Sequence, residues 1–202
     1  MRLYYQQGDH RVGRIVSVLI TTEQECELVP LSSGDVSTLP EIRQISPLGM
    51  LPVLVTESVS LYTVNSILKH IAKLRKEKGQ AGLLLKEESQ IDQWLDICNC
   101  EVDPFTNLIY DQMTTGYPEN HFVEATFKEL KKILRVLEAR FRTEGSYIVG
   151  YGPSIADIAI SSSLSMPFWP IYRDYLATLF PHVTKWLTNC QERFHFSSVF
   201  YP

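Results

Sequence analysis

The stretch from residue 41 to residue 55, EIRQISPLGMLPVLV, constrains the fold more than any other part of the chain. Ile42 and Ile45 predict a helical turn, and Pro47 predicts its end, because the residue before a proline is pushed out of the helical region. The apolar run LPVLV predicts a buried strand with Pro52 at its entrance, where a missing amide donor is tolerated. On its own, this stretch is also compatible with an ordinary helix-to-strand turn.

The composition is that of a globular protein. Of 202 residues, 45% are hydrophobic and 21% are charged, so a sizeable core is expected. Lys and Arg number 19 against 23 Asp and Glu, and the net charge of −4 argues against a broad basic face for nucleic acid. No apolar run approaches the length of a membrane span, and the first residues, MRLYYQQGDH, lack the apolar core of a signal peptide. We expect no contact with membranes and no direct contact with nucleic acid.

The cysteines do not indicate a disulfide framework or a metal site. They are Cys26, Cys98, Cys100 and Cys190, with sparse and irregular spacing. Cys98 and Cys100 are the one close pair, and on a helix two residues two positions apart point in different directions. A structural zinc site also requires four ligands. We therefore expect free thiols, no bound metal and a reducing, cytoplasmic environment.

The order of predicted elements divides the chain into two domains. The first part reads as strand, helix and strand, followed by helix, strand, strand and a last helix that starts at Val64. Charged residues then lead into a linker. We assign residues 1–78 to the first domain, residues 79–86 to the linker and residues 87–202 to the second domain.

The second domain reads as helical throughout. Apolar residues recur at helical spacing in three long segments, and Pro104 is expected to kink the first of them. The expected helices cover residues 87–110, 122–142 and 181–193.

The segment YIVGYGPSIADIAI, residues 147–160, contains a helix start. Ser154 and Asp157 have the spacing of a capping box, in which each side chain accepts a hydrogen bond from the backbone amide of the other. Asp157 also complements the positive end of the helix dipole. This pair is a structural device and not a catalytic one, and the loss of such a cap costs about 1 kcal/mol, or more when the carboxylate is buried.

Both segments resemble motifs of the glutathione-transferase superfamily. Residues 147–160 are similar to its y-l-v-G-x-x-x-T/S-x-A-D-x-x motif, and residues 41–55 to its helix, Pro-x-Gly turn and cis-proline strand. The resemblance implies a thioredoxin-like N-terminal domain followed by an α-helical C-terminal domain, the glutathione-transferase fold. It also implies a cis peptide bond before Pro52.

The resemblance places a glutathione site at positions that depart from the family's pattern. Leu51 and Pro52 supply the backbone element that pairs with the cysteinyl part of glutathione. Thr63 and Val64 stand where an acidic residue and a serine would hold the γ-glutamyl group, and valine cannot donate a hydrogen bond. We therefore regard these four residues as the remnant of a glutathione site.

No convincing group for thiol activation is present near the first strand. Tyr5 and His10 are weak catalytic candidates; the simpler interpretations are a buried strand aromatic and an exposed loop histidine. Asp9 would raise the energy of a nearby thiolate. A glutathione cofactor is expected only if the chain is an enzyme.

The C-terminal segment FPHVTKWLTNCQERFHFSSVF, residues 180–200, resembles the end of the corresponding domain of elongation factor 1-gamma and valyl-tRNA synthetase, with Trp186 and Cys190 in matching places. Residues 89–104 resemble the same domains through Trp94, and the start of the third helix is nearer to that of methionyl-tRNA synthetase. The resemblance implies a non-catalytic interaction module of the translation machinery. Its partners would be modules of the same fold or other subunits of a translation complex, in a homo- or hetero-oligomer. The alternative is a glutathione S-transferase or glutathione-dependent peroxidase with a divergent site.

The segment MPFWPIYRDY, residues 166–175, is unusually aromatic. Aromatic residues and arginine are the types that anchor protein interfaces, so the predicted contact residues are Phe168, Trp169, Tyr172 and Arg173. Alternatively, the two prolines bend the chain and the aromatic side chains fold into the core.

Overall fold

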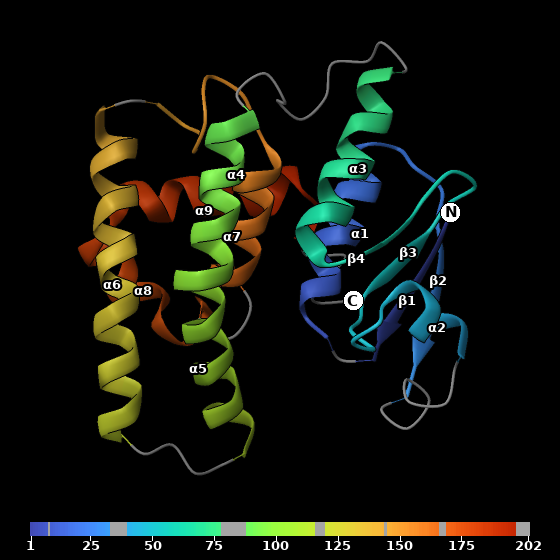
Figure 1. Ribbon diagram of the computed structural model, residues 1–202. Helices are drawn as coiled ribbons and strands as arrows, with labels where there is room; N and C mark the ends of the chain where they lie inside the picture. Colours follow the sequence, from blue (N-terminus) through green and yellow to red (C-terminus); the bar gives the residue numbers. More distant parts are fainter. Residues whose placement is uncertain are drawn as a thin grey trace. The chain divides into compact units, whose positions relative to one another are not determined.

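The chain divides into two compact units, Met1–Gly82 and Leu83–Pro202. Figure 1 shows the computed structural model, and each unit is described by itself. The structure describes residues 1–7, 9–32, 40–77, 88–115, 120–143, 145–165 and 169–196.

The first unit is built on a four-stranded sheet. Its strands are β1 (Arg2–Gln6), β2 (Glu27–Leu31), β3 (Val53–Val55) and β4 (Ser60–Tyr62), in the spatial order β2-β1-β3-β4. β1 is parallel to β2 and antiparallel to β3, and β3 is antiparallel to β4. The crossover between the parallel strands β1 and β2 is a helix, as a parallel pair requires.

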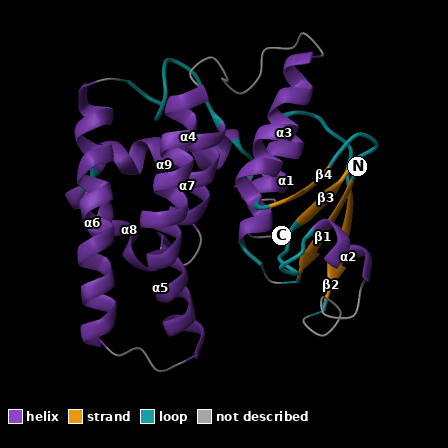
Figure 2. Cartoon of the chain, in the orientation of Figure 1, coloured by secondary structure: helices purple, strands orange, loops and turns teal. Residues whose placement is uncertain are grey.

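Three helices cover this sheet. They are α1 (Arg11–Thr21), α2 (Pro40–Ile45) and α3 (Val64–Glu77). α1 and α3 pack against each other on one face, and α2 lies on the other face (Figures 1 and 2). Ile15 of α1 and Ile67 of α3 are fully buried. This arrangement confirms the predicted thioredoxin-like half.

The predicted helix, turn and strand around Pro52 are present. The Leu51–Pro52 peptide bond is cis, which confirms the expectation from the resemblance. Gly49 has a φ of 66°, a left-handed conformation that glycine adopts without strain. The turn is held by the fully buried Ser46, whose hydroxyl accepts a hydrogen bond from the Met50 amide at 2.8 Å.

The second unit consists of helices in the part that the structure describes. The helices are α4 (Glu88–Ile97), a π-helical turn η1 (Cys98–Val102), α5 (Asp103–Thr115), α6 (Asn120–Thr143), α7 (Ile155–Ser165), α8 (Trp169–Leu179) and α9 (Pro181–Arg193). Every residue of α7 is buried, and α7 contacts α4, η1, α5 and α9. It is therefore the core helix of this unit, as the apolar run after Asp157 predicts.

The irregularity expected at Pro104 takes the form of a π-helical turn that lies just before it. The irregular turn is η1, which ends just before α5, and Pro104 is the second residue of α5. α4, η1 and α5 follow one another without a break, so Pro104 lies inside a continuous helical run, where it has no amide to donate to the preceding turn. Beside this turn, the buried Asp103 accepts a hydrogen bond from the Ser163 hydroxyl at 2.7 Å, and the Cys98 sulfur lies 3.7 Å from the same carboxylate oxygen.

Candidate functional site

The register of the sheet brings the expected glutathione-site positions to one edge of the first unit. Tyr4 near the end of β1 pairs with Val53 at the start of β3, and Val53 pairs with Tyr62 at the end of β4. Pro52 and Thr63 follow directly from these paired positions, one before β3 and one after β4. The edge therefore carries the end of β1, the cis-proline and the approach to α3.

An ion pair lies at this edge, at the start of α1. Asp9 Oδ1 accepts hydrogen bonds from the Arg11 amide at 3.0 Å and from Arg11 Nε at 2.9 Å. Arg11 Nη2 donates to Asp9 Oδ2 at 2.7 Å, and it lies 3.4 Å from the carbonyl oxygen of Leu51. The Asp9 side chain is 8% exposed and that of Arg11 is 39% exposed. The guanidinium thus bridges a nearly buried carboxylate and the residue before the cis-proline.

The two weak catalytic candidates have ordinary structural settings. Tyr5 is a partly exposed residue of β1 that pairs with Pro30 in the neighbouring strand. His10 is the N-cap residue of α1, is partly exposed and makes no side-chain capping hydrogen bond. Their assignment to thiol activation therefore stays a prediction.

The start of α3 offers hydroxyl groups but no acidic group at the expected positions. Thr63 is exposed and its hydroxyl donates to the Ser66 hydroxyl at 2.9 Å. Thr63 has a φ of 103°, which is strained for a β-branched residue and typical of functional positions. Val64 is only 8% exposed, so its side chain belongs to the core. The side chains at these two positions therefore differ from the acidic residue and serine expected to hold a γ-glutamyl group.

This arrangement does not favour thiolate chemistry. A thiolate is stabilised by a nearby positive charge or hydroxyl donor. The positive charge of Arg11 is matched by the bidentate contact with Asp9, so the pair is neutral as a unit. The Asp9–Arg11 pair was not anticipated from the sequence, because nothing in the local pattern indicates that Arg11 reaches Leu51.

The Ser154–Asp157 pair lies at the centre of a buried network in the second unit. Asp157 Oδ2 accepts from the Ser154 amide at 3.0 Å and from its hydroxyl at 2.7 Å, and the Asp157 amide lies 3.4 Å from the Ser154 hydroxyl. Asp157 Oδ1 accepts from the Ile148 amide at 2.9 Å and from Trp186 Nε1 at 3.0 Å. Burial raises the pKa of Asp157, and these hydrogen bonds oppose the rise. The network is structural, since no substrate could reach a fully buried carboxylate.

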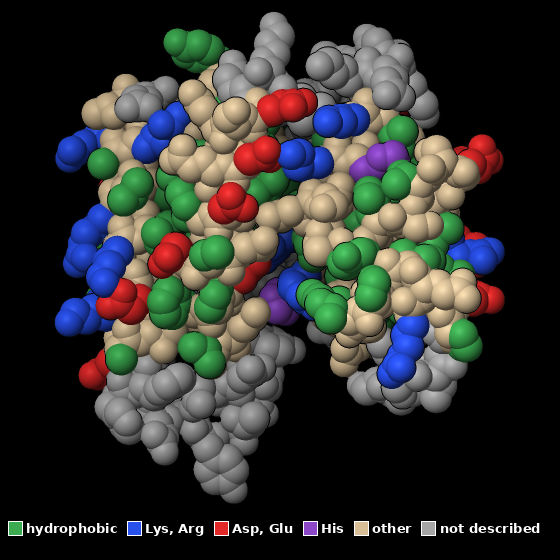
Figure 3. Space-filling model, in the orientation of Figure 1, with side chains coloured by type: hydrophobic (Ala, Val, Ile, Leu, Met, Phe, Trp, Pro, Cys, Tyr) green, Lys and Arg blue, Asp and Glu red, His purple; other side chains and the backbone are tan. Residues whose placement is uncertain are grey.

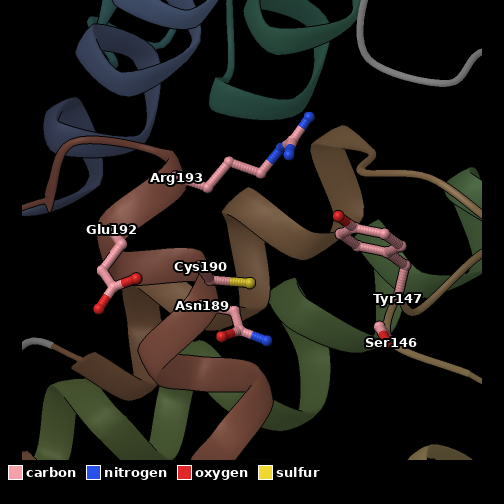
Figure 4. Close-up of a pocket in the computed structure, with 6 residues that line it drawn as sticks. All are labelled: Ser146, Tyr147, Asn189, Cys190, Glu192 and Arg193. Atoms are coloured by element: carbon pink, nitrogen blue, oxygen red, sulfur yellow. The ribbon is translucent and has the colours of Figure 1, made fainter.

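A pocket of about 410 Å³ in the second unit lies beside the thiol of Cys190 (Figure 4). Figure 4 shows the Cys190 side chain pointing toward the pocket and Tyr147 and Ser146 on the opposite wall. Burial raises the pKa of the Cys190 thiol well above its usual value, and the charge of Asp157 adds to this effect. The thiol is therefore protonated at neutral pH and unsuited to nucleophilic chemistry.

Further candidates lie outside the described residues or have no support among them. Phe168 is outside the described residues, and so are the side chains of Trp169, Tyr172 and Arg173, whose backbone begins α8. In the described ranges no three acidic, histidine or cysteine side chains gather as a metal site would require. No helix in those ranges combines the length and the apolar character needed to cross a bilayer.

Comparison with known proteins identifies the family. Residues 10–79 match the family model of the glutathione S-transferase N-terminal domain, and residues 97–193 match that of the C-terminal domain. The chain belongs to the glutathione-transferase superfamily. A probable glutathione S-transferase from Oryza sativa subsp. japonica is 29% identical over 202 residues, which cover 96% of this chain and 92% of that protein.

Elongation factors 1-gamma match a smaller part of this chain at a similar identity. Elongation factor 1-gamma 3 from Oryza sativa subsp. japonica is 28% identical over 161 residues, which cover 79% of this chain and 38% of the elongation factor. Elongation factor 1-gamma from Trypanosoma cruzi is 33% identical over 123 residues, or 60% of this chain and 29% of that protein. The chain thus spans about two fifths or less of the elongation factors that it matches.

Solved structures of glutathione transferases share the fold. Glutathione S-transferase I bound to lactoylglutathione superposes with a TM-score of 0.84 at 24% identity, covering 98% of this chain and 97% of that one. A glutathione S-transferase from Xanthobacter autotrophicus gives a TM-score of 0.74 at 21% identity, covering 94% and 92%. At these identities the likeness shows the fold alone.

Proposed function

We propose that this chain is a non-catalytic interaction module of the translation machinery, related to the corresponding part of elongation factor 1-gamma. The observation that carries the proposal is the Asp9–Arg11 pair at the residue before the cis-proline. A carboxylate, and a guanidinium already bonded to it, lie beside the residue whose backbone is expected to pair with the cysteinyl part of glutathione. Such a module acts by docking, without a chemical step and without a cofactor.

The start of α3 supports the same proposal. A γ-glutamyl group carries a carboxylate, which is best held by hydroxyl and amide donors at a helix N-terminus. Val64 turns an apolar side chain into the core at that place, and the Thr63 hydroxyl is bonded to Ser66. Glutathione recognition is expected to use a thiol-activating group, the backbone before the cis-proline, and an acidic residue with a serine at the start of α3. The first and the last of these depart from the family's pattern in this chain.

The proposed partners are modules of the same fold or other subunits of a translation complex, in the cytoplasm. This part of the proposal is supported by the elongation factors, which match this chain about as closely as the transferase does. It includes the predicted contact residues Phe168, Trp169, Tyr172 and Arg173 as a second proposed surface.

The first experiment measures glutathione binding by calorimetry. We expect no heat of binding below millimolar concentrations and no conjugation of a standard electrophile. The control is the double variant Asp9→Ser and Val64→Ser, which removes the carboxylate and supplies a hydroxyl donor at both altered positions. Gain of binding in the double variant would show that the scaffold is intact and that these two side chains abolish the site. Tight binding or turnover by the wild type would overturn the non-catalytic proposal.

The second experiment tests docking directly. The tagged chain is used to recover partners from cell lysate, and the translation-factor and tRNA-synthetase subunits are quantified by mass spectrometry against a catalytic glutathione transferase as control. Enrichment of these subunits is the expected result. Equal recovery by both baits would contradict the assembly role.

The alternative is a glutathione S-transferase or peroxidase with a divergent site. It is favoured by the similarity to a transferase along 92% of that protein's length. It requires that Tyr5 or His10 activates the thiol despite the neighbouring carboxylate of Asp9. Loss of a measurable turnover on Tyr5→Phe or His10→Ala, with unchanged melting temperature, is the result that would establish it.

A further inference from the structure

A groove of about 430 Å³ lies between α6 and α8 in the second unit. One wall carries the cationic side chains of Lys131, Arg135 and Arg142 from a single face of α6. The other wall carries Tyr175 and Leu179, which are one turn apart on α8 and are 46% and 44% exposed. The groove therefore combines a basic wall with an apolar one. In Figure 3, Lys and Arg side chains gather over α6 along the edge of this unit.

Two of these cations are open to a ligand. Arg135 and Arg142 are exposed, and neither forms an ion pair within the part of the chain that the structure describes. Lys131 is turned to the opposite wall, where its Nζ donates to the Tyr175 hydroxyl at 3.2 Å and lies 5.6 Å from the ring centroid. Lys131 thus orients the tyrosine, while the two arginines are left to face an external anion.

The acidic residue of the groove is already engaged. Glu138 accepts hydrogen bonds from the Val183 amide at 3.0 Å and from the His182 amide at 3.2 Å, and it pairs with the His182 ring at 2.6 Å. Its carboxylate faces the start of α9, and the three cationic side chains of the groove outnumber it. The positive character of the groove is therefore retained within a chain of net charge −4.

The spacing of the arginines indicates the form of the ligand. Arg135 and Arg142 are seven residues apart on α6, which is about 10 Å along the helix axis. Carboxylates three residues apart on a polyproline II segment point the same way and lie about 9 Å apart, because that helix has three residues per turn. An apolar side chain between them would meet Tyr175 and Leu179.

We propose that this groove binds an acidic segment of a partner protein, in which two carboxylates flank an apolar side chain. The inference deepens the proposed assembly function and rests on it. Nucleic acid is disfavoured as the ligand, because two open cations beside an apolar wall do not form the extended basic face that a phosphate backbone requires. The arginines supply bidentate contacts to carboxylates, and the apolar wall supplies an anchor of the kind found at interface centres.

The test uses a labelled synthetic peptide that contains Glu-Leu-Ala-Glu in a glycine-rich frame. Binding is followed by chemical-shift changes in the isotope-labelled full chain. We expect shifts at Arg135, Arg142 and Leu179, and at least about tenfold weaker binding by the double variant Arg135→Glu and Arg142→Glu. The matched control is Arg43→Glu with Lys185→Glu, two exposed residues outside the groove, which makes the same change in net charge. This control should bind the peptide within about twofold of the wild type.

Two further measurements separate the contribution of charge to binding from that of the apolar wall. A peptide with glutamine in place of glutamate should lose binding, and Leu179→Ala should weaken binding without changing its dependence on salt. Equal binding by the charge-reversed variant, shifts confined to another surface, or tighter binding of a single-stranded RNA of matched charge would each overturn the proposal.

The groove and the assembly function can fail separately. If the charge-reversed variant recovers the same translation subunits from lysate as the wild type, the groove is not the docking surface although the assembly function stands. If the wild type recovers none of them, the assembly function fails, whatever the peptide titration shows.

Discussion

Replacement of Asp157 by alanine should destabilise the second unit strongly and selectively. The carboxylate is fully buried and accepts four hydrogen bonds, from the Ile148 amide, the Ser154 amide and hydroxyl, and Trp186 Nε1. The Ser154 hydroxyl can rotate to another acceptor. The two amides and the indole N–H have fixed directions and would be left buried without a partner.

The magnitude follows from these three donors. A buried donor that loses its partner costs about 1–3 kcal/mol, so the three together cost roughly 3–9 kcal/mol. Burial raises the pKa of Asp157, which means that the buried charge itself is unfavourable. Replacing the carboxylate removes this charge and so recovers part of the lost free energy of unfolding. We therefore expect about 4 kcal/mol for Asp157→Ala, a large share of the stability of an ordinary domain. For a protein of this size that corresponds to a fall in melting temperature of about 8–16 °C.

Tryptophan fluorescence is the appropriate assay, because all three tryptophans (Trp94, Trp169 and Trp186) belong to the second unit. Thermal and urea unfolding followed at this signal report on that unit, whereas circular dichroism reports on both. The control is Asp157→Asn, which keeps the shape and one acceptor oxygen and should lose about half as much. A loss below about 1 kcal/mol for Asp157→Ala would refute the reasoning that unsatisfied donors dominate.

Three further predictions concern other sites. Partial burial alone would raise the pKa of Glu138, but hydrogen bonds from Val183 and His182 hold this pKa below its usual value. The stabilising contribution of Glu138 is therefore present above about pH 4.3 and is lost as the pH falls through the folded-state pKa. Glu138→Gln should flatten the acid limb of a plot of stability against pH, and an unchanged limb would contradict this. Maleimide at pH 8 should label the exposed Cys100 well before the buried Cys190, as peptide mass spectrometry can show. Equal labelling rates would refute the conclusion that the Cys190 thiol is buried and unreactive. Thr63→Gly should increase the free energy of unfolding of the first unit by about 1 kcal/mol, because it relieves the backbone strain, and should therefore raise its melting temperature. A lower melting temperature by circular dichroism would show that the contacts of the Thr63 side chain contribute more than the strain costs.

The features predictable from sequence are those specified by neighbouring residues. A proline after an apolar helical turn, and a serine three positions before an aspartate, act through the local backbone, and the structure shows α2 ending before Pro47 and the hydrogen bonds between Ser154 and Asp157. The cis bond at Pro52 is also present, but it was expected from the family resemblance and not from the neighbouring residues. The π-helical turn at Cys98–Val102 was missed because one extra residue in a helix hardly alters an apolar stripe. Pro104 indicated the region of the irregularity, but not its π-helical form.

Contacts between distant residues were not predictable in the same way. Arg11 reaches Leu51 across 40 positions, and Trp186 reaches Asp157 across 29. Periodicity indicates which face of an element is buried, but it does not indicate which buried donor meets which acceptor. The candidate site was therefore located from the sequence, whereas the ion pair that carries the functional proposal became visible only in the structure.

The buried network that stabilises the fold, around Asp157, is separate from the positions where a glutathione site would lie. The functional proposal can therefore be tested with variants that remain folded. The Asp9 carboxylate accepts an amide hydrogen bond at the start of α1, and the loss of such an acceptor costs about 0.5–2 kcal/mol, so Asp9→Ser, which keeps an acceptor oxygen, should leave the first unit folded. Val64 is a core residue, so its serine variant should cost about 1–2 kcal/mol, which is less than the loss expected for Asp157→Ala. A failure of the double variant to bind glutathione would thus reflect missing recognition and not unfolding, provided that its circular dichroism, which reports on both units, matches the wild type. Gain of binding would instead mean that the scaffold around the cis-proline still accepts the peptide, and that two side chains distinguish a docking module from a transferase.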